Sequence, residues 1–278
     1  MRTAPRSDPR HARFPQFARK RFGQHFLIDD QVVFEIVRYL ALQTTETVVE
    51  IGPGRGALTE HLLVSGASIE AIEIDRDLVS ALRQRFAESP NLAIREADAL
   101  RFDFLGLGAN RGMLRVIGNL PYNIATALLF HLLQARHVIS DMCLMVQKEV
   151  AERLVAAPRT AAYGRLSVMI QAYADVAQIV QVHPASFTPP PKVDSSVVAI
   201  VPHRVESPDL PFNELRTVVA TAFSQRRKMV RHTLGKMVPP AILSAHQIAL
   251  TQRPGEISVE QYTELARSLH QYPDRIDL

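Results

Sequence analysis

Short apolar runs alternate with amphipathic segments between residues 47 and 147, and this alternation restricts the chain to few folds. Apolar runs occupy residues 47–51, 68–75, 92–95, 114–117 and 141–147, and helical patterns separate them. An earlier helix is expected after Asp29-Asp30, and another over residues 124–135. Strands that alternate with helices are typical of a doubly wound parallel sheet. The sequence therefore predicts an α/β fold.

The pattern changes after Tyr163. Residues 179–182 and 196–201 indicate two late, paired strands on either side of a triple proline at residues 189–191. A linker rich in proline and charge, residues 202–211, precedes a helical tail whose apolar residues trace one face over residues 212–237. We expect three parts: a disordered basic arm (1–18), a large domain (19–202) and a helical C-terminal domain (203–278). A chain of 278 residues with 47% hydrophobic content can bury the core that this division needs.

The net charge of +4 is unevenly distributed. Residues 1–27 carry seven basic residues and one acid, whereas the remaining 251 residues carry 25 basic and 27 acidic residues. The first segment also contains three prolines and lacks helical periodicity, so we expect disorder before about residue 19. Its charge suits an electrostatic arm for nucleic acid or a solvated tail; the prolines argue against a transit-peptide helix.

Cysteine, histidine and hydropathy patterns exclude several classes of protein. Cys143 is the single cysteine and lies in an apolar run, which predicts a buried side chain and a reducing compartment such as the cytoplasm. The ten histidines show no metal-ligand spacing, so no metal site is expected. No apolar run approaches the roughly 18 residues of a membrane span. We expect a soluble protein with no membrane partner.

A glycine loop follows the first strand and predicts a nucleotide site. Gly52-x-Gly54-x-x-Ala57 fits the dinucleotide fingerprint, and Glu73, twenty-one residues after Gly52, is placed to bind ribose hydroxyls. The ligand is either a nicotinamide dinucleotide or S-adenosylmethionine. Glu50, beside the loop, would repel a pyrophosphate and attract the ammonium of a methionine group, which favours S-adenosylmethionine. Asp98, after the third strand, is placed to accept from an adenine amine; the alternatives are a surface charge for Glu73 and a helix cap for Asp98.

The second chemical motif is Gly118-Asn119-Leu120-Pro121-Tyr122, at the end of the run 114–117. Open α/β sheets bind ligands at this carboxyl edge. Pro121 keeps Leu120 extended, so the carbonyls there cannot join a helix. Asn119 adds a side-chain acceptor and Tyr122 a flat ring, which together suit a planar substrate with an exposed amine. The alternative is a strand-to-helix turn with an Asn cap.

These residues resemble the ribosomal RNA adenine dimethyltransferase family, and the resemblance covers about residues 19–270 in order. It is carried by residues 50–59, Glu73-Ile74-Asp75, Asp98-Ala99 and Asn119-Leu120-Pro121-Tyr122. Three further motifs, at residues 163–168, 187–195 and 223–228, resemble the branch that modifies small-subunit RNA. The resemblance implies a seven-stranded, Rossmann-like class I methyltransferase sheet with a small helical C-terminal domain.

The resemblance also implies an activity and its residues. Members of the family use S-adenosylmethionine to dimethylate the N6 amines of two adjacent adenosines in the 3′-terminal hairpin loop of 16S rRNA, in the immature 30S subunit, and a monomer is expected. Position by position, the cofactor residues are His25, Leu27, Gly52, Glu73, Asp98 and Asn119; Glu50 and Gly54 join them from the loop argument above. The family more often has Asn at the position of His25.

The implied mechanism is catalysis by orientation. Asn119 and the Leu120 carbonyl would hold both hydrogens of an adenine amine and aim its lone pair at the methyl donor. Tyr122 would stack on the target base, and Phe187 would close its other face, with about 1–3 kcal/mol for each stack. The alternative for Phe187 is a core aromatic.

A run of positive charge in the C-terminal domain predicts an RNA contact. Arg226, Arg227, Lys228, Arg231 and Lys236 lie between Phe223 and Met237, with no acid among them. The first four are the candidate RNA-binding residues, and a solvated helix face is the alternative. Within the same chemistry, a methyltransferase of large-subunit RNA or a mitochondrial relative remains open, as does a ribosome-assembly factor. A nicotinamide oxidoreductase is disfavoured because no hydride-transfer partner is found.

Overall fold

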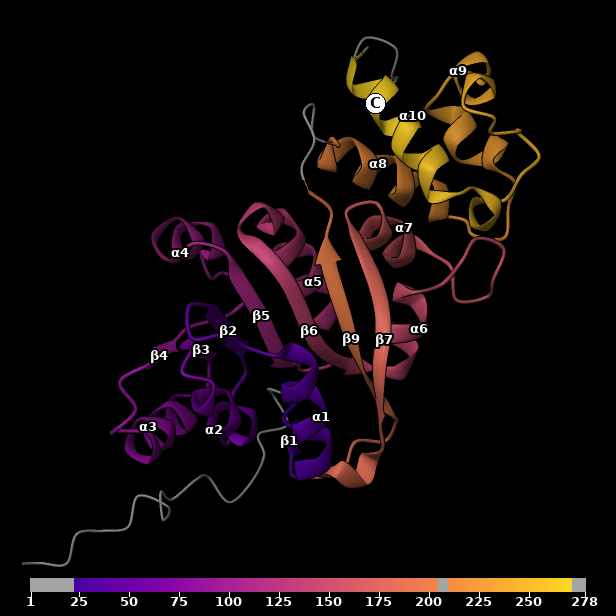
Figure 1. The fold of residues 1–278 in the computed structure, drawn as a ribbon. Coiled ribbons are helices and arrows are strands. Elements are labelled where there is room, and N and C mark those ends of the chain that lie inside the picture. The colour runs from indigo at the N-terminus through magenta and orange to yellow at the C-terminus, as the bar shows by residue number, and fades with distance from the viewer. Residues whose placement is uncertain (1–22, 205–209, 272–278) are drawn as a thin grey trace, which may run out of the picture. The chain divides into compact units, whose positions relative to one another are not determined.

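Seven strands form one mixed sheet in the order β4-β3-β2-β5-β6-β9-β7, and β1 and β8 form a separate antiparallel pair (Figure 1). The computed structural model describes residues 23–204 and 210–271. The predicted basic arm, residues 1–18, lies outside these ranges, as do residues 205–209 of the predicted linker. The strands are β1 (Phe26–Leu27), β2 (Thr47–Ile51), β3 (Ser68–Glu73), β4 (Leu92–Glu96), β5 (Leu114–Asn119), β6 (Ile139–Gln147), β7 (Ala174–Val182), β8 (Phe187–Thr188) and β9 (Ser195–Pro202).

Helices connect the strands and form the C-terminal part. The α-helices are α1 (Asp30–Leu40), α2 (Ala57–Val64), α3 (Arg76–Arg85), α4 (Phe104–Arg111), α5 (Ala125–Gln134), α6 (Lys148–Leu154), α7 (Arg165–Gln171), α8 (Phe212–Phe223), α9 (Pro240–Ala245) and α10 (Val259–Gln271). Short 3-10 helices are η3 (Arg136–Val138), η4 (Pro184–Ser186), η5 (Val230–His232), η6 (Leu234–Lys236) and η7 (Pro254–Glu256). In the part of the chain that the structure describes, no helix is long and apolar enough to cross a membrane.

The predicted α/β fold is confirmed, and the sheet has the seven strands that the family resemblance implies. The pairs β2–β3, β3–β4, β2–β5 and β5–β6 are parallel, whereas β9 runs antiparallel to β6. The two late strands are neighbours in the sheet, as predicted, although β7 begins five residues earlier than expected. All five residues of β2 are buried, which explains why this parallel strand is apolar apart from Thr47 and Glu50.

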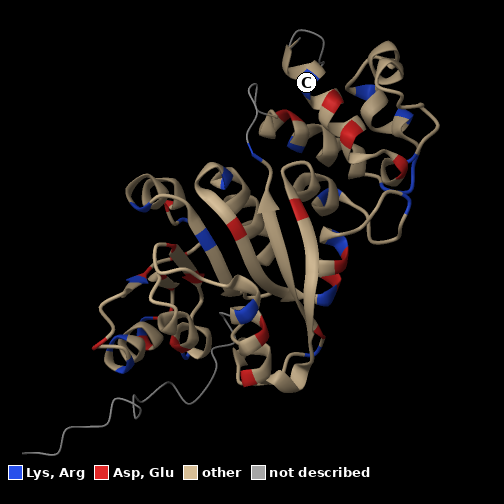
Figure 2. Ribbon diagram, in the orientation of Figure 1, with Lys and Arg blue, Asp and Glu red and all other residues tan. Residues whose placement is uncertain are grey.

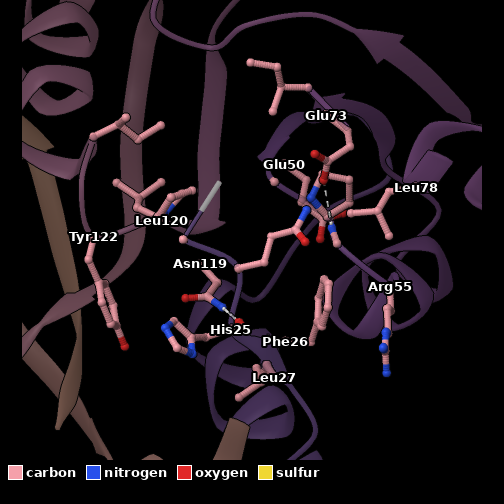
Figure 3. A pocket seen from close by; sticks show the side chains of 18 of the residues that line it. His25, Phe26, Leu27, Glu50, Arg55, Glu73, Leu78, Asn119, Leu120 and Tyr122 are labelled. Carbon is pink, nitrogen blue, oxygen red and sulfur yellow. Dashed lines mark hydrogen bonds between the residues drawn. The ribbon is translucent and has the colours of Figure 1, made fainter. Parts of the chain in front are cut away.

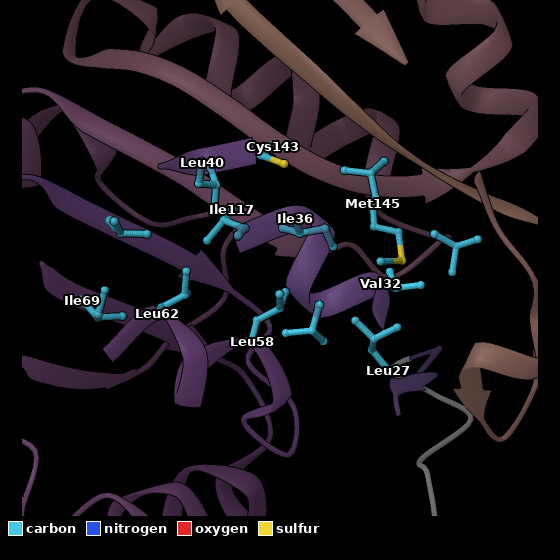
Figure 4. Close-up of a cluster of buried hydrophobic side chains, with 14 of the residues drawn as sticks. Leu27, Val32, Ile36, Leu40, Leu58, Leu62, Ile69, Ile117, Cys143 and Met145 are labelled. Carbon is cyan, nitrogen blue, oxygen red and sulfur yellow. The ribbon is translucent and has the colours of Figure 1, made fainter. Parts of the chain in front are cut away.

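A hydrophobic cluster joins α1 and α2 to the sheet (Figure 4). The α1 helix begins where Asp29 accepts hydrogen bonds from Gln31 N (3.1 Å) and Val32 N (3.4 Å), which confirms the predicted start. Its buried residues, Val32, Val33, Ile36 and Leu40, belong to the cluster. Cys143 is also a member, and its burial raises the thiol pKa to about 12. The prediction of a buried cysteine is confirmed.

Contacts divide the chain into two compact units. Unit 1 contains the residues up to Lys148 and Ala177–Val201, and unit 2 contains Glu149–Val176 and the chain from Pro202 onward. The expected division assigned residues 149–176 to the large domain. They group with the C-terminal helices because α7 packs against α8 and α10, and the buried Tyr163 donates a hydrogen bond to Ile257 O (3.0 Å).

One arginine joins several elements of unit 1 at the start of β5. The Arg115 guanidinium binds Asp141 on β6 through Nη2 (2.7 Å) and Nε (2.9 Å). Its Nη1 donates to Glu46, ahead of β2 (3.0 Å), and to the carbonyl of Leu40 at the end of α1 (2.8 Å). The Arg115 side chain is only 15% exposed. Its removal would leave the carboxylates of Asp141 and Glu46 and the carbonyl of Leu40 without their shared donor.

We expect Arg115→Met to lower the free energy of unfolding by about 2–3 kcal/mol, because half-buried carboxylates lose their charge partner. The measurement is urea denaturation followed by circular dichroism. Arg76→Met is the matched control, since Arg76 is 84% exposed and pairs with Glu96 at the surface; it should change stability by no more than about 0.5 kcal/mol. Equal effects of the two substitutions would contradict the role of Arg115.

Candidate active site

A cavity of about 280 Å³ opens at the carboxyl edge of the sheet in unit 1, and it brings together all of the predicted catalytic and cofactor residues except Phe187 (Figure 3). All eight predicted cofactor residues line it: His25, Leu27, Glu50, Gly52, Gly54, Glu73, Asp98 and Asn119. Leu120 and Tyr122 line it as well. The walls come from the ends of β2, β3, β4 and β5 and from the segment that contains β1.

The glycine loop forms one wall between β2 and α2. Gly52 and Gly54 have φ values of +67° and +59°, a region that L side chains rarely adopt. A Cβ on Gly54 would lie 3.1 Å from the Phe26 ring, and one on Gly52 would lie 3.7 Å from Asn119 O. The glycines thus let the loop turn sharply and keep the space beside Asn119 open.

Two buried glutamates lie next to this loop. Glu50 is 1% exposed, and its Oε2 accepts a hydrogen bond from Thr59 Oγ1 (2.6 Å). Burial raises the pKa of Glu50 to about 7, with the Thr59 hydrogen bond acting against it and the charge of Glu73 adding to it. A buried carboxylate of this kind favours a cation as its ligand.

Glu73 ends β3 and is held by the main chain. Its Oε2 accepts from Gly54 N (3.2 Å) and its Oε1 from Asp75 N (2.9 Å). Burial raises the pKa of Glu73, and these two hydrogen bonds lower it. Each oxygen keeps a lone pair, so the carboxylate can still accept from the hydroxyls of a ligand.

Asp98 follows β4, is half-buried and lines the cavity. Its Oδ1 accepts from Leu100 N (2.9 Å), as a cap would, and the side chain lines the cavity as well. The cap and the ligand role were alternatives in the sequence, and the structure is compatible with both at once because a carboxylate has two oxygens.

Asn119 and Leu120 present two acceptors at the end of β5. Asn119 Nδ2 donates to His25 O (2.8 Å), a contact drawn in Figure 3. Because a carbonyl only accepts, this bond fixes the amide with Oδ1 as its free acceptor. Leu120 N donates to Met145 O (3.0 Å), and among the described residues neither Asn119 Oδ1 nor Leu120 O has a hydrogen-bond partner. The motif therefore offers two carbonyl oxygens to a ligand.

Tyr122 and His25 stack on each other beside these acceptors. Their ring centroids are 5.5 Å apart with an interplanar angle of 24°. The Tyr122 hydroxyl bonds to Ser195 Oγ (2.7 Å), and His25 Nδ1 donates to Pro189 O (2.7 Å). Burial raises the pKa of the Tyr122 hydroxyl, so the ring stays neutral. His25 covers the Tyr122 ring from one side.

Phe187 does not line the cavity in this structure, so the predicted contact with the target base stays a prediction. Its side chain is 2% exposed and belongs to the hydrophobic cluster. The reason is the pairing of β8 with β1, in which Phe187 lies opposite Leu27. The core-aromatic alternative describes its position.

Gln24 and Phe26 belong to the cavity wall but were not predicted from the sequence. Gln24 Nε2 donates to the buried Asp75 (3.0 Å), and Phe26 lies under the guanidinium of Arg55, 4.5 Å from its ring centroid. Both residues line the cavity. Their partners are distant in the chain, and the only local signal was the run of polar and aromatic residues before Leu27.

In unit 2 the basic run does not extend a helix. The predicted helix over residues 212–237 is wrong: α8 ends at Phe223, and turns connect it to η5. Val230 N instead donates to Gln252 O (2.8 Å), so tertiary contacts replace helical ones. Arg226, Arg227, Lys228 and Arg231 are exposed, but Arg226 also donates to Ala161 O and Tyr163 O.

No group of three or more His, Cys, Asp or Glu residues suited to a metal ion occurs within residues 23–204 and 210–271.

Comparison with curated proteins gives close relatives along almost the whole chain. A ribosomal RNA small subunit methyltransferase A from Pseudomonas fluorescens is 46% identical over 257 residues, 92% of this chain and 95% of that protein. The protein of the same name from Alcanivorax borkumensis is 50% identical over 251 residues, 89% of each.

Solved structures agree with the fold. A dimethyladenosine transferase from Plasmodium falciparum matches 91% of this chain and 100% of its own, with a TM-score of 0.77 and 26% identity. The 23S rRNA methyltransferase ErmE matches 88% of this chain and 100% of its own, with a TM-score of 0.66 and 25% identity.

The profile of one sequence family, ribosomal RNA adenine dimethylase, matches residues 16–271. With this match, with relatives at 45–50% identity, and with a seven-stranded methyltransferase sheet whose carboxyl edge holds the site, the chain belongs to the ribosomal RNA adenine dimethylase family.

Proposed function

We propose that the chain transfers methyl groups from S-adenosylmethionine to the N6 amines of two adjacent adenosines in the 3′-terminal hairpin loop of 16S rRNA. Family membership and the relatives named for small-subunit RNA support this activity. The single structural observation that carries it is the pair of unengaged acceptors, Asn119 Oδ1 and Leu120 O, at the wall of a cavity lined by Glu50, Glu73 and Asp98.

The cavity fits S-adenosylmethionine by the chemistry of its walls. Glu50 suits the ammonium of the methionine group, Glu73 the ribose hydroxyls and Asp98 the adenine amine. Gly52 lacks the side chain that would fill the space toward Asn119. A pyrophosphate fits less well, because it would lie beside the buried carboxylate of Glu50. When bound, S-adenosylmethionine supplies an electrophilic methyl carbon.

The residues of the Asn119 motif act by orientation. An adenine N6 amine is a weak nucleophile because its lone pair is delocalised into the ring. Asn119 Oδ1 and Leu120 O accept its two hydrogens, which favours a pyramidal nitrogen with a localised lone pair. Because Asn119 is already held by His25 O, this acceptor needs no reorientation when the base arrives. Tyr122 stacks on the base through the face that His25 does not cover.

The substrate must offer an unpaired adenine, since a stacked and paired base hides its amine. We propose that unit 2 contributes to the binding of the RNA through Arg227, Lys228 and Arg231, which are exposed cations without an acidic neighbour in the run 224–237. Figure 2 marks the Lys and Arg positions along the loop that follows α8. Arg226 is shared between this surface and the two carbonyls that it binds.

The activity is tested with methyl-labelled S-adenosylmethionine and ribosomal subunits that lack the modification. We expect label in immature 30S subunits, as N6,N6-dimethyladenosine at two adjacent positions of the 3′-terminal hairpin of 16S rRNA, located by nuclease digestion and mass spectrometry. Subunits of 50S are the parallel arm. Label in 23S rRNA, or binding to 30S particles without any transfer, would contradict the proposal.

Substitution Asn119→Ala should reduce turnover by at least about a hundredfold, as loss of one oriented acceptor does in other preorganised sites. Affinity for S-adenosylmethionine, measured by calorimetry, should change little, since Asn119 acts mainly on the amine. Asn123→Ala is the matched control, because Asn123 is an exposed asparagine at the same cavity. Near wild-type methylation by the Asn119 variant would end this assignment.

The double substitution Arg227→Gln/Lys228→Gln should weaken RNA binding and reduce the slope of log K against log salt by about 1–2, because two phosphate contacts are lost. Filter binding between 50 and 300 mM KCl measures the slope. Arg226→Gln is the comparison: it should also lower the melting temperature, since Ala161 O and Tyr163 O lose their donor. An unchanged slope in the double variant places the phosphate contacts elsewhere.

A further inference from the structure

The two carboxylate oxygens of Glu50 have different surroundings. Oε2 accepts a short hydrogen bond, 2.6 Å, from Thr59 Oγ1, and no side chain of the described residues donates to Oε1. The main-chain N–H of Thr59 also favours the charged form of the carboxylate. Glu50 lines the cavity, whereas Thr59 does not. Thr59 is fully buried in the first turn of α2, behind the carboxylate.

The glycine loop makes this contact possible. It returns the chain from the end of β2 into α2 within five residues, so that the third residue of the helix faces the strand it has just left. A hydroxyl donates one hydrogen, and an ionised carboxylate can only accept, so the direction of the bond is fixed. The hydrogen bond therefore stabilises the charged form of Glu50 over the neutral form.

We propose that Thr59 is a positioning residue of the methyl-donor site: it holds one oxygen of the Glu50 carboxylate and leaves the other for the cationic amine of the donor. The inference rests on the proposed function for the identity of that ligand. Thr59 acts only through Glu50, at the back of the site, and makes no contact with the ligand.

The groups around Glu50 determine whether its carboxyl is charged, and the Thr59 hydroxyl is one of those that favour the charged form. Burial and the like charge of Glu73, on β3, favour the neutral carboxyl, and Thr59 on α2 opposes them. The other ionisable residues lining the cavity are His25, Arg55, Asp98 and Tyr122. A neutral Glu50 loses its attraction for an ammonium, so the Thr59 hydroxyl sets the pH below which a cationic ligand binds poorly.

The test measures the affinity of the free protein for S-adenosylhomocysteine, which has the same amine, by calorimetry between pH 5.5 and 8.5. Wild-type affinity should fall as the pH drops below about 7, because Glu50 takes up a proton. Thr59→Val should move this fall up by about one pH unit, so that Kd at pH 7 weakens about fivefold while Kd at pH 8.5 nearly matches the wild type. Thr59→Ser keeps the hydroxyl and should restore the wild-type profile.

Two controls make the result specific. The Glu50→Gln variant should bind S-adenosylhomocysteine weakly, and its affinity should not fall further at acidic pH. Adding Thr59→Val to this variant should not change that affinity. The amine of the ligand titrates on the alkaline side in the same way for every variant. Thr59→Ala removes the hydroxyl with less volume and replaces Thr59→Val if melting curves show that valine is not accommodated.

The outcomes separate the positioning role of Thr59 from the proposed function. A Thr59→Val profile that is weakened equally at every pH, or that is identical to the wild type, overturns the positioning role. Serine failing to restore the profile does so as well. Wild-type protein that binds no S-adenosylhomocysteine at any pH counts instead against the proposed function.

Discussion

The parallel register of four strands is the constraint on which the site depends. Ile51 of β2 lies level with Ile72 of β3 and with Gly118 of β5, and Glu73 lies level with Glu96 of β4. Parallel strands in register end at one edge, so residues separated by up to seventy positions meet there. Gly118 allows this closeness, because a Cβ at that position would lie 2.5 Å from Ile51 O. The strands themselves thus determine the spacing of the cavity walls.

Burial of several acids in one cavity gives the site its preference for cations. Glu50, Glu73 and Asp75 are nearly inaccessible, and their mutual repulsion is offset by main-chain N–H groups and by hydroxyl and amide side chains. A cationic ligand would reduce the repulsion among these carboxylates, whereas a polyphosphate would add to it.

The elements found from the sequence are those with a local cause. A strand covered on both faces is a continuous apolar run, an aspartate before an apolar helix face caps that helix, and glycines between strand and helix mark the loop; all three are visible without a partner. His25 and Leu27 of the cavity wall came from the family resemblance, whereas Gln24 and Phe26 were not predicted, because their contacts are with the distant residues Asp75 and Arg55. The burial of Phe187 and the end of α8 were not predicted, for the same reason. An aromatic ring before three prolines is compatible with stacking on a base or with packing in the core, and its pairing with Leu27 is not visible in the sequence. The seven-residue spacing between Phe223 and Val230 is compatible with a helix, but Val230 N donates to the distant Gln252 O instead.

The pairing of β1 with β8 joins chain segments about 160 residues apart, and it has a consequence for the order in which the protein matures during synthesis. The glycine loop and its acids are complete once the first 120 residues have left the ribosome. His25, however, has neither Pro189 nor the β8 strand beside it until the chain has grown past residue 189. A nascent chain that ends before residue 189 contains Glu50, Glu73 and Asp98 of the cavity but lacks the partners of His25 in its wall. The wall that His25 forms is therefore completed later in synthesis than the glycine loop, because its partner Pro189 lies late in the chain.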